Sequence, residues 1–216
     1  MDERRKNDNS KPRNKKPTIL DHSLRVAYYS VCIAKELGLD ARKIRTISLA
    51  AKLHDIGKIC VLDEILLKPN TLDPAEKAMI RRHPEYGAQL LVDMDYAYDD
   101  FSFSIESHHE NFDGTGYPNG IAGYDIPIAA RIISIADTFD ALTTVRGYNT
   151  PSDLEDALVE IQLKEDTQFD PDLVRVFIRY VMNNVDEINQ IIESANQNKP
   201  LDEQFELKAD SLKMGY

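Results

Sequence analysis

The sequence predicts an all-α domain, on three observations. Apolar residues recur at three- and four-residue spacings along most of the chain. The alternation of apolar and polar residues that is typical of half-buried strands is almost absent. The loops between the helical patterns are short, except for residues 111–127, "NFDGTGYPNGIAGYDIP", where four glycines and two prolines exclude a regular element. A loop of this length in a compact domain is usually functional.

Capping residues mark the ends of the expected helices. The first pattern ends at Gly38, and the second opens on Asp40 as an N-cap. A third pattern opens on Asp73, followed by Pro74 at the first helical position, and the internal Pro84 divides it into two helices. Four later patterns complete the prediction, at residues 98–110, 128–144, 152–163 and 171–192.

The last of these patterns carries a regular apolar stripe that has two interpretations. It could be the seam for a partner helix, which would make the chain a homodimer. It could also be the final core helix packing inward, which the usual behaviour of amphipathic helices favours. The stripe comprises Val174, Ile178, Val181, Val185, Ile188 and Ile192.

Length and composition indicate one domain with polar tails. The chain has 216 residues, 42% of them hydrophobic, and no apolar run approaches the roughly 18 residues that a membrane helix needs. We expect a disordered basic arm at 1–17, the domain at 18–193 and a C-terminal tail at 194–216. The start of the chain lacks the apolar segment of a signal peptide, so a cytoplasmic location is predicted. Cys32 and Cys60, both in apolar sequence, are expected to be buried free thiols.

The charge of the domain limits its partners. The formal net charge is −11, and because residues 1–17 hold seven basic and three acidic side chains, or +4, the remainder carries −15. A domain this acidic repels a long polyanion, so duplex DNA or RNA is not expected as a partner. A small phosphate ligand is compatible with this charge if bound metal ions supply local positive charge.

The histidines form a pattern with two aspartates. Singly, a histidine near a helix end is more often capped or solvated than bound to a metal. All five histidines nevertheless lie at or beside expected helix ends, and Asp137 interrupts the apolar run "RIISIADTF", where an aspartate is costly to bury unless it is paired or bound to a metal. Asp140 and Thr144 extend a polar stripe on the same helix face. The candidate metal ligands are His22, His54, Asp55, His83, His108, His109 and Asp137.

These seven nitrogen and oxygen ligands suit two divalent transition metals better than one ion. Iron or manganese is favoured, with zinc, cobalt or nickel as alternatives. The set contains no cysteine, so we expect open positions filled by water, as in a catalytic centre. We assign one ion to His22, His54, Asp55 and Asp137, and the second to His83, His108 and His109, with Asp55 as the bridge.

Several segments resemble those of one known family. In order, they are "HDIGKI", "LLKP", "RRHPEYG", "HHENFDGTGYPNGI", "RIISIADTFDALTT" and "RGY". Their order and spacing are similar to those of the HD-GYP family, a branch of the HD-domain metal-dependent phosphohydrolases, from His22 to the "FDP" at 169–171. The resemblance implies an HD-domain helical bundle with a binuclear, sometimes trinuclear, metal centre. The implied activity is hydrolysis of cyclic di-GMP to linear pGpG or on to GMP.

The resemblance also implies roles for individual residues. Two metals would lower the pKa of a bridging water, and the resulting hydroxide would act on the phosphodiester with Asp55 and Lys58 as catalytic residues. Lys58 would also contact a phosphate oxygen, and Asp140, Arg146 and Tyr117 would lie beside the substrate. Taken alone, Lys58 could be a solvated lysine and Arg146 a surface arginine.

The loop at 111–127 contains the "GYP" sequence, and three readings of it stay open. Tyr117 could close over the substrate, or the loop could dock another signalling protein. The third reading is a surface loop whose tyrosine packs onto the helices.

Two departures from the family pattern modify these expectations. A third metal in some members binds a glutamate four residues before the first histidine; that position is Thr18 here and Asp21 points elsewhere, so two metals are predicted. The run "RGYN" has Gly147 and places Asn149 where members often carry a basic residue, which leaves the base preference open. The alternatives are therefore a hydrolase of another cyclic dinucleotide, such as cyclic GMP-AMP, and a non-catalytic signalling or docking module.

Overall fold

The computed structural model describes residues 19–68, 70–95, 100–145, 150–197 and 199, and within these ranges the chain is helical with no β-strand. The all-α prediction is confirmed. The α-helices are α1 (Ile19–Glu36), α2 (Ala41–Leu53), α3 (Asp63–Leu66), α4 (Pro74–Ile80), α5 (His83–Asp93), α6 (Phe101–Glu106), α7 (Ile128–Thr143), α8 (Leu154–Leu163), α9 (Pro171–Asn183) and α10 (Val185–Asn196), and two 3-10 helices are η1 (Ile56–Cys60) and η2 (Gly123–Asp125).

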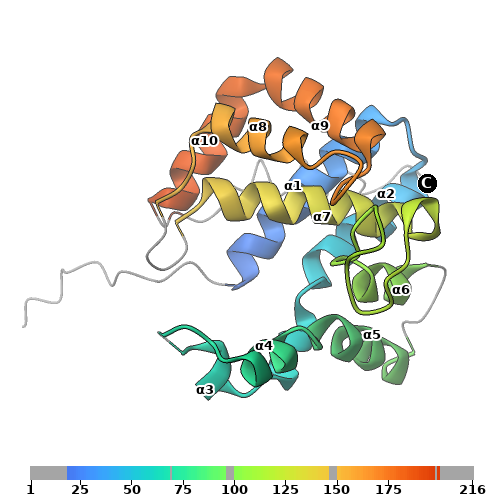
Figure 1. The fold of residues 1–216 in the computed structure, drawn as a ribbon. Coiled ribbons are helices and arrows are strands. Elements are labelled where there is room, and N and C mark those ends of the chain that lie inside the picture. Colours follow the sequence, from blue (N-terminus) through green and yellow to red (C-terminus); the bar gives the residue numbers. More distant parts are fainter. Residues whose placement is uncertain (1–18, 69, 96–99, 146–149, 198, 200–216) are drawn as a thin grey trace, which may run out of the picture.

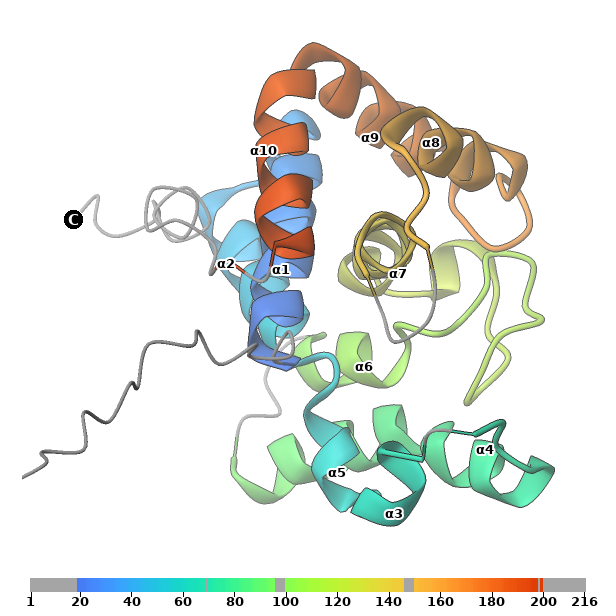
Figure 2. The ribbon, with the colours of Figure 1, turned by 90° about the vertical axis from the view of Figure 1, so that its left-hand side faces the viewer.

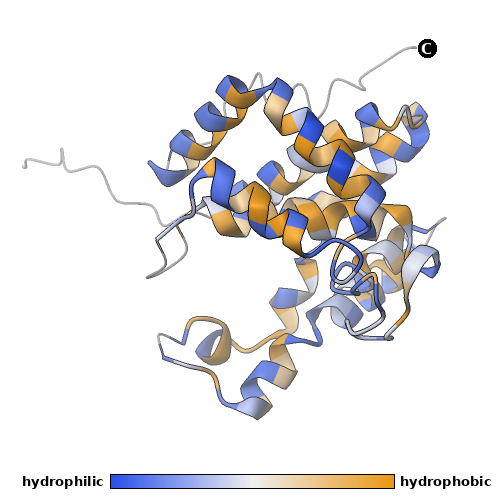
Figure 3. Ribbon diagram, turned by 45° about the horizontal axis from the view of Figure 1, so that its top comes forward, coloured by the Kyte–Doolittle hydropathy of each residue, from blue (hydrophilic) through white to orange (hydrophobic). Residues whose placement is uncertain are grey.

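Helices α1 and α7 lie at the centre of the molecule (Figure 1). Helices α8, α9 and α10 cover one side of this pair, and α3, α4 and α5 lie on the other side, with α6 between (Figures 1 and 2). The hydrophobic residues gather on the sides of the helices that face one another (Figure 3). An aromatic ladder joins three of the helices, since Phe139 of α7 lies edge-to-face against Tyr29 of α1 and Phe177 of α9, with both pairs of ring centroids 5.0 Å apart.

The predicted helix caps are present. The Asp40 carboxylate accepts a hydrogen bond from the backbone N–H of Lys43 at the start of α2. Asp73 and Glu76 form a reciprocal capping box at the start of α4, with Pro74 at the first position. Gly38, after α1, has a φ of +67°, a conformation that favours glycine. None of the helices in the described part of the chain combines the length and apolar character needed to cross a bilayer.

Two predictions about the helices and cysteines were wrong. The single helix expected at 171–192 is two helices, α9 and α10, because the backbone leaves the helical conformation at Asn184, whose side-chain amide donates instead to the carbonyl of Tyr180. Cys60 lies at the end of η1 and is exposed, whereas Cys32 is buried as expected.

The apolar stripe of α9 and α10 packs into the core of the chain. Val174, Val181 and Ile188 are fully buried against the other helices. The inward-packing interpretation therefore accounts for the stripe, and homodimerisation stays a prediction that the stripe no longer supports.

Gly57 allows η1 to press against the start of α5. A Cβ atom at Gly57 would lie 1.9 Å from the carbonyl oxygen of His83 and 2.4 Å from the backbone nitrogen of Gly87. Both obstacles are backbone atoms of α5, so no side-chain rotation can relieve them. The glycine of the "HDIG" segment thus brings the turn after Asp55 into backbone contact with the helix that begins at His83.

We predict that Gly57→Ala lowers the free energy of unfolding by about 3 kcal/mol, because the added methyl group forces η1 away from α5. Gly38→Ala is the matched control: no atom lies within 4 Å of its added Cβ, and its positive φ costs about 1 kcal/mol. Urea denaturation of both variants measures the difference. Equal loss of stability in the two variants would show that the close approach at Gly57 is not required.

Candidate metal centre

The seven predicted metal ligands come from five helices and converge on one site. His22 lies in the first turn of α1, and Asp137 lies in α7. The others stand at helix ends: His54 caps the C-terminus of α2, and His83 begins α5. The pair His108 and His109 follows directly after α6.

The ligand atoms form two groups. The groups are His22 with His54 and Asp55, and His83 with His108 and His109, and within each the ligand atoms lie within 4.8 Å of one another. The second group is the set assigned to one ion from the sequence, and the first contains three of the four residues assigned to the other ion. Asp137 joins the first group, with Oδ1 3.2 Å from Nε2 of His22.

The carboxylate of Asp55 lies between the two groups. Its Oδ1 atom is 3.2 Å from Nε2 of His83. Its Oδ2 atom is 3.5 Å from Nε2 of His54 and 4.0 Å from Nε2 of His22. One oxygen thus faces each group, which is the geometry required of a carboxylate that bridges two ions.

Backbone carbonyl groups orient three of the imidazoles in the same way. The Nδ1 atoms of His54, His83 and His108 lie 2.7, 2.8 and 2.6 Å from the carbonyl oxygen three residues earlier in the chain. A carbonyl oxygen can only accept, so each Nδ1 carries the hydrogen and donates it. In the neutral rings, Nε2 therefore carries no hydrogen, and its lone pair is directed into the site.

The resulting lone pairs require a cation. Nε2 of His54 is buried and has no hydrogen-bond partner among the described residues. The Nε2 atoms of His83 and His108 face each other at 3.3 Å, although both rings already use their hydrogen at Nδ1. Two lone pairs at this distance repel each other unless a metal ion, or an extra proton on one ring, lies between them. Nitrogens that share one ion lie about 3 to 3.4 Å apart, since a Zn–N bond is about 2.1 Å, so the residues fit a bound metal.

The protonation states of five of the seven candidate ligands also suit metal binding. Burial lowers the pKa of His54, lowers that of His108 well below its ordinary value, and lowers the pKa of His109 to about 4. Burial alone would raise the pKa of Asp55 and Asp137, but the neighbouring histidines outweigh it and hold both pKa values below the ordinary range. Neutral imidazoles and ionised carboxylates are the forms that bind metals at neutral pH.

Asp140 has a different position from the one predicted. It was expected beside the substrate, but its carboxylate is fully buried and accepts hydrogen bonds from three nitrogens. Nδ1 of His22 lies 2.7 Å from Oδ2, and the guanidinium of Arg25 forms a forked pair at 2.5 and 3.0 Å. Asp140 therefore orients His22, as a carboxylate does behind a metal-binding histidine. Arg25 was not predicted from the sequence, although its three-residue spacing from His22 matches that of Asp140 from Asp137.

The predicted substrate residues are brought together only in part. Nζ of Lys58 lies 2.5 Å from Oδ2 of Asp55, so the ammonium group is at the centre but is paired with a carboxylate. The ring of Tyr117 stacks on His109, with centroids 4.9 Å apart and 22° between the planes. Arg146 lies outside the described residues, as do Thr18, Gly147 and Asn149.

A polar pocket of about 370 Å³ opens beside the second ligand group. His108, His109 and Asp137 line it, and the loop at 111–127 forms one wall. The buried carboxylate of Glu110 holds this loop by accepting the backbone N–H groups of residues 119 and 120.

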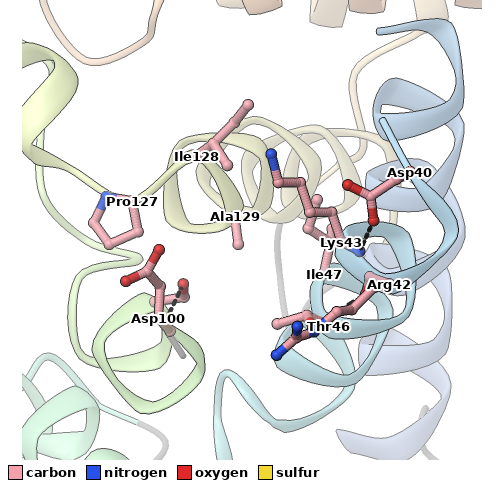
Figure 4. Close-up of a pocket in the computed structure, with 10 residues that line it drawn as sticks. Asp40, Arg42, Lys43, Thr46, Ile47, Asp100, Pro127, Ile128 and Ala129 are labelled. Carbon is pink, nitrogen blue, oxygen red and sulfur yellow. Dashed lines mark hydrogen bonds between the residues drawn. The ribbon is translucent and has the colours of Figure 1, made fainter. Parts of the chain in front are cut away.

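A second pocket, of about 360 Å³, lies between α2, the start of α6 and the start of α7 (Figure 4). None of the candidate metal ligands lines it. The Asp40 carboxylate at its edge is already used as the cap of α2. The metal chemistry therefore belongs to the first pocket.

Comparison with known proteins identifies the family. Residues 13–173 match the HD domain family. The chain belongs to the HD domain family. A solved structure of an HDG"Y"P protein from Bdellovibrio bacteriovorus resembles this HD domain with a TM-score of 0.64 and 25% sequence identity, over 78% of this chain and 54% of the other. The resemblance to HD-GYP proteins is thus confirmed.

Two curated relatives of this HD domain carry functional names. The chain is 38% identical to the cyclic di-GMP phosphodiesterase response regulator RpfG of Xanthomonas campestris pv. campestris. This match extends over 156 residues, or 72% of this chain. The chain is 39% identical to the 3′3′-cGAMP-specific phosphodiesterase 2 of Vibrio cholerae. This match extends over 160 residues, or 74% of this chain. The matches cover 41% and 31% of those relatives, so the chain spans less than half of their length.

We predict that Asp140→Asn weakens metal binding by about 10- to 100-fold, because His22 loses the carboxylate that orients it. The same change lowers the free energy of unfolding by about 3 kcal/mol, since the buried Arg25 loses its charged partner. Asp153→Asn is the control, as Asp153 is an exposed helix cap that asparagine can replace. Calorimetric titration of chelator-treated protein with Mn²⁺ tests this, and wild-type affinity in Asp140→Asn would contradict the role assigned to Asp140.

Proposed function

We propose that this HD domain is a metal-dependent phosphodiesterase that hydrolyses cyclic di-GMP to linear pGpG, GMP or both. The observation that carries the proposal is the position of the Asp55 carboxylate, with one oxygen toward each of two imidazole groups. Such an arrangement suits two divalent ions, which together activate water and neutralise phosphoryl oxygens when bound. The name of the Xanthomonas relative supports cyclic di-GMP as the substrate.

The protein groups have separable tasks in this reaction. His22, His54, Asp137 and Asp55 would hold one ion, and the second group, together with Asp55, would hold the other. The residues are fixed by helix ends and backbone carbonyls, so the centre is organised before the substrate arrives. The nitrogen and oxygen ligands fit iron or manganese, with zinc, cobalt or nickel as alternatives.

Lys58 forms an ion pair with Asp55. Its side chain is 28% exposed, and its ammonium group donates to the Asp55 carboxylate. We infer that it donates a hydrogen bond to a phosphoryl oxygen as negative charge develops there, because a fixed cation stabilises that charge most where water is excluded. This is the catalytic role assigned to Lys58.

A second candidate is hydrolysis of a mixed cyclic dinucleotide. The Vibrio relative that is 39% identical carries the name 3′3′-cGAMP-specific phosphodiesterase 2. The non-catalytic alternative is disfavoured, because all seven ligand residues are present and converge. A protein partner at the loop 111–127, a homodimer and a cytoplasmic location stay predictions from the sequence.

We predict that the chain, purified under reducing conditions and loaded with Mn²⁺ or Fe²⁺, converts cyclic di-GMP to linear products, and that His54→Ala and Asp55→Ala each abolish turnover. Asp63→Asn, an exposed carboxylate eight residues after Asp55, serves as the control and keeps wild-type activity. Chromatography of the products gives the readout. Faster turnover of 3′3′-cGAMP than of cyclic di-GMP would favour the second candidate, and no turnover of either compound would reject the proposal.

A further inference from the structure

Arg81 is an exposed residue beside the candidate metal centre, and it was not singled out from the sequence. It follows directly after α4, two residues before the candidate ligand His83. It lines the same 370 Å³ pocket as His108, His109 and Asp137. Its side chain is exposed, so a ligand in the pocket can reach it.

An aromatic ring holds the guanidinium of Arg81 in place. Cζ of Arg81 lies 4.1 Å from the centroid of the Tyr117 ring, within cation–π distance. The same ring stacks on the imidazole of His109. Tyr117 thus connects Arg81 to the second ligand group through ring contacts.

This contact leaves the hydrogen-bonding edge of Arg81 available. Stacking uses the face of the guanidinium, whereas its N–H groups lie in the plane of the group. No carboxylate of the described residues lies within ion-pair distance of Arg81. Its neighbour Arg82 differs, because Arg82 pairs with Glu85 at 3.1 Å, lies over Tyr86 and does not line the pocket.

Arg81 differs from the other residues that line the pocket in its charge. All residues that line the pocket belong to the described ranges, and Arg81 is the one among them with a permanent positive charge. A cyclic dinucleotide carries two phosphodiester groups, each with one negative charge. The metal centre can neutralise the group that is cleaved, but the second group needs another cation in a domain whose overall charge is negative. Guanidinium is well suited because it binds two phosphate oxygens at once.

We propose that Arg81 binds the second, uncleaved phosphate of the cyclic dinucleotide, and that Tyr117 is a positioning residue that holds Arg81 in this orientation. The inference rests on the proposed function and deepens it. It also changes the role predicted for Tyr117, which was expected to lie beside the substrate. Its ring contacts His109 and Arg81, so we infer that it affects substrate binding through Arg81.

The test compares two substrates in three proteins: wild type, Arg81→Ala and Arg82→Ala. With cyclic di-GMP, Arg81→Ala raises KM about 10- to 100-fold with little change in kcat, as expected for loss of a charged hydrogen bond present in the bound and transition states. With bis(p-nitrophenyl) phosphate, which has one phosphate group, Arg81→Ala matches wild type. Arg82→Ala matches wild type with both substrates, and all three proteins bind equal amounts of manganese.

The outcomes separate this inference from the proposed function. If the wild type neither binds nor cleaves cyclic di-GMP, the proposed function fails and the inference fails with it. If the wild type cleaves cyclic di-GMP and Arg81→Ala behaves like Arg82→Ala, the inference alone is overturned. Equal losses with both substrates, or loss of manganese, also overturn it, since Arg81 would then act through the metal centre.

Two further measurements test the ligand group and the role of Tyr117. Phosphate recognition predicts that Arg81→Ala weakens binding of cyclic di-GMP and cyclic di-AMP by the same factor, whereas a loss confined to cyclic di-GMP would assign Arg81 to the guanine base and overturn the phosphate contact. Tyr117→Phe, which keeps the ring, retains the wild-type KM for cyclic di-GMP. Tyr117→Leu, which removes it, raises KM toward that of Arg81→Ala; a wild-type KM in Tyr117→Leu would contradict the positioning role.

Discussion

The carboxylate of Asp55 is the constraint on which the rest of the site depends. It is almost fully buried, and its two oxygens face different groups of imidazoles. An ionised carboxylate in this position is stable only if positive charge surrounds it. Lys58 supplies one such charge at 2.5 Å, and the lone pairs of the facing histidines show where metal ions would supply more. The fold can therefore be understood as a means of holding several helix ends around one buried anion.

Helix ends are suited to positioning ligands around this carboxylate because they leave backbone groups without helical partners. His54, His83 and His108 each use a free carbonyl oxygen three residues earlier to fix Nδ1, so the same local geometry aims three imidazoles from three helices. Gly57 then permits the backbone contact that sets Asp55 beside His83. His22 lies in the first turn of α1, and the buried pair of Asp140 and Arg25 orients it.

Local chemistry explains which features could be predicted from the sequence. The caps at Asp40 and Asp73 depend on residues within one turn, and the two ligand groups could be assigned because so few histidines are present. Features that depend on distant contacts were not predictable in this way. The role of Asp140 was wrongly predicted because its partner Arg25 is 115 residues away in the chain. The cation–π contact of Arg81 could not be predicted because it joins a helix end to a distant loop.

The most direct test of this account is anomalous X-ray diffraction from crystals of the chain grown with Mn²⁺. We expect two anomalous peaks on either side of the Asp55 carboxylate, about 3.5 to 4 Å apart as in other two-metal sites. One peak would lie against His22 and His54, and the other against His83 and His108. A single peak, or two peaks that do not share Asp55 as a ligand, would contradict the account.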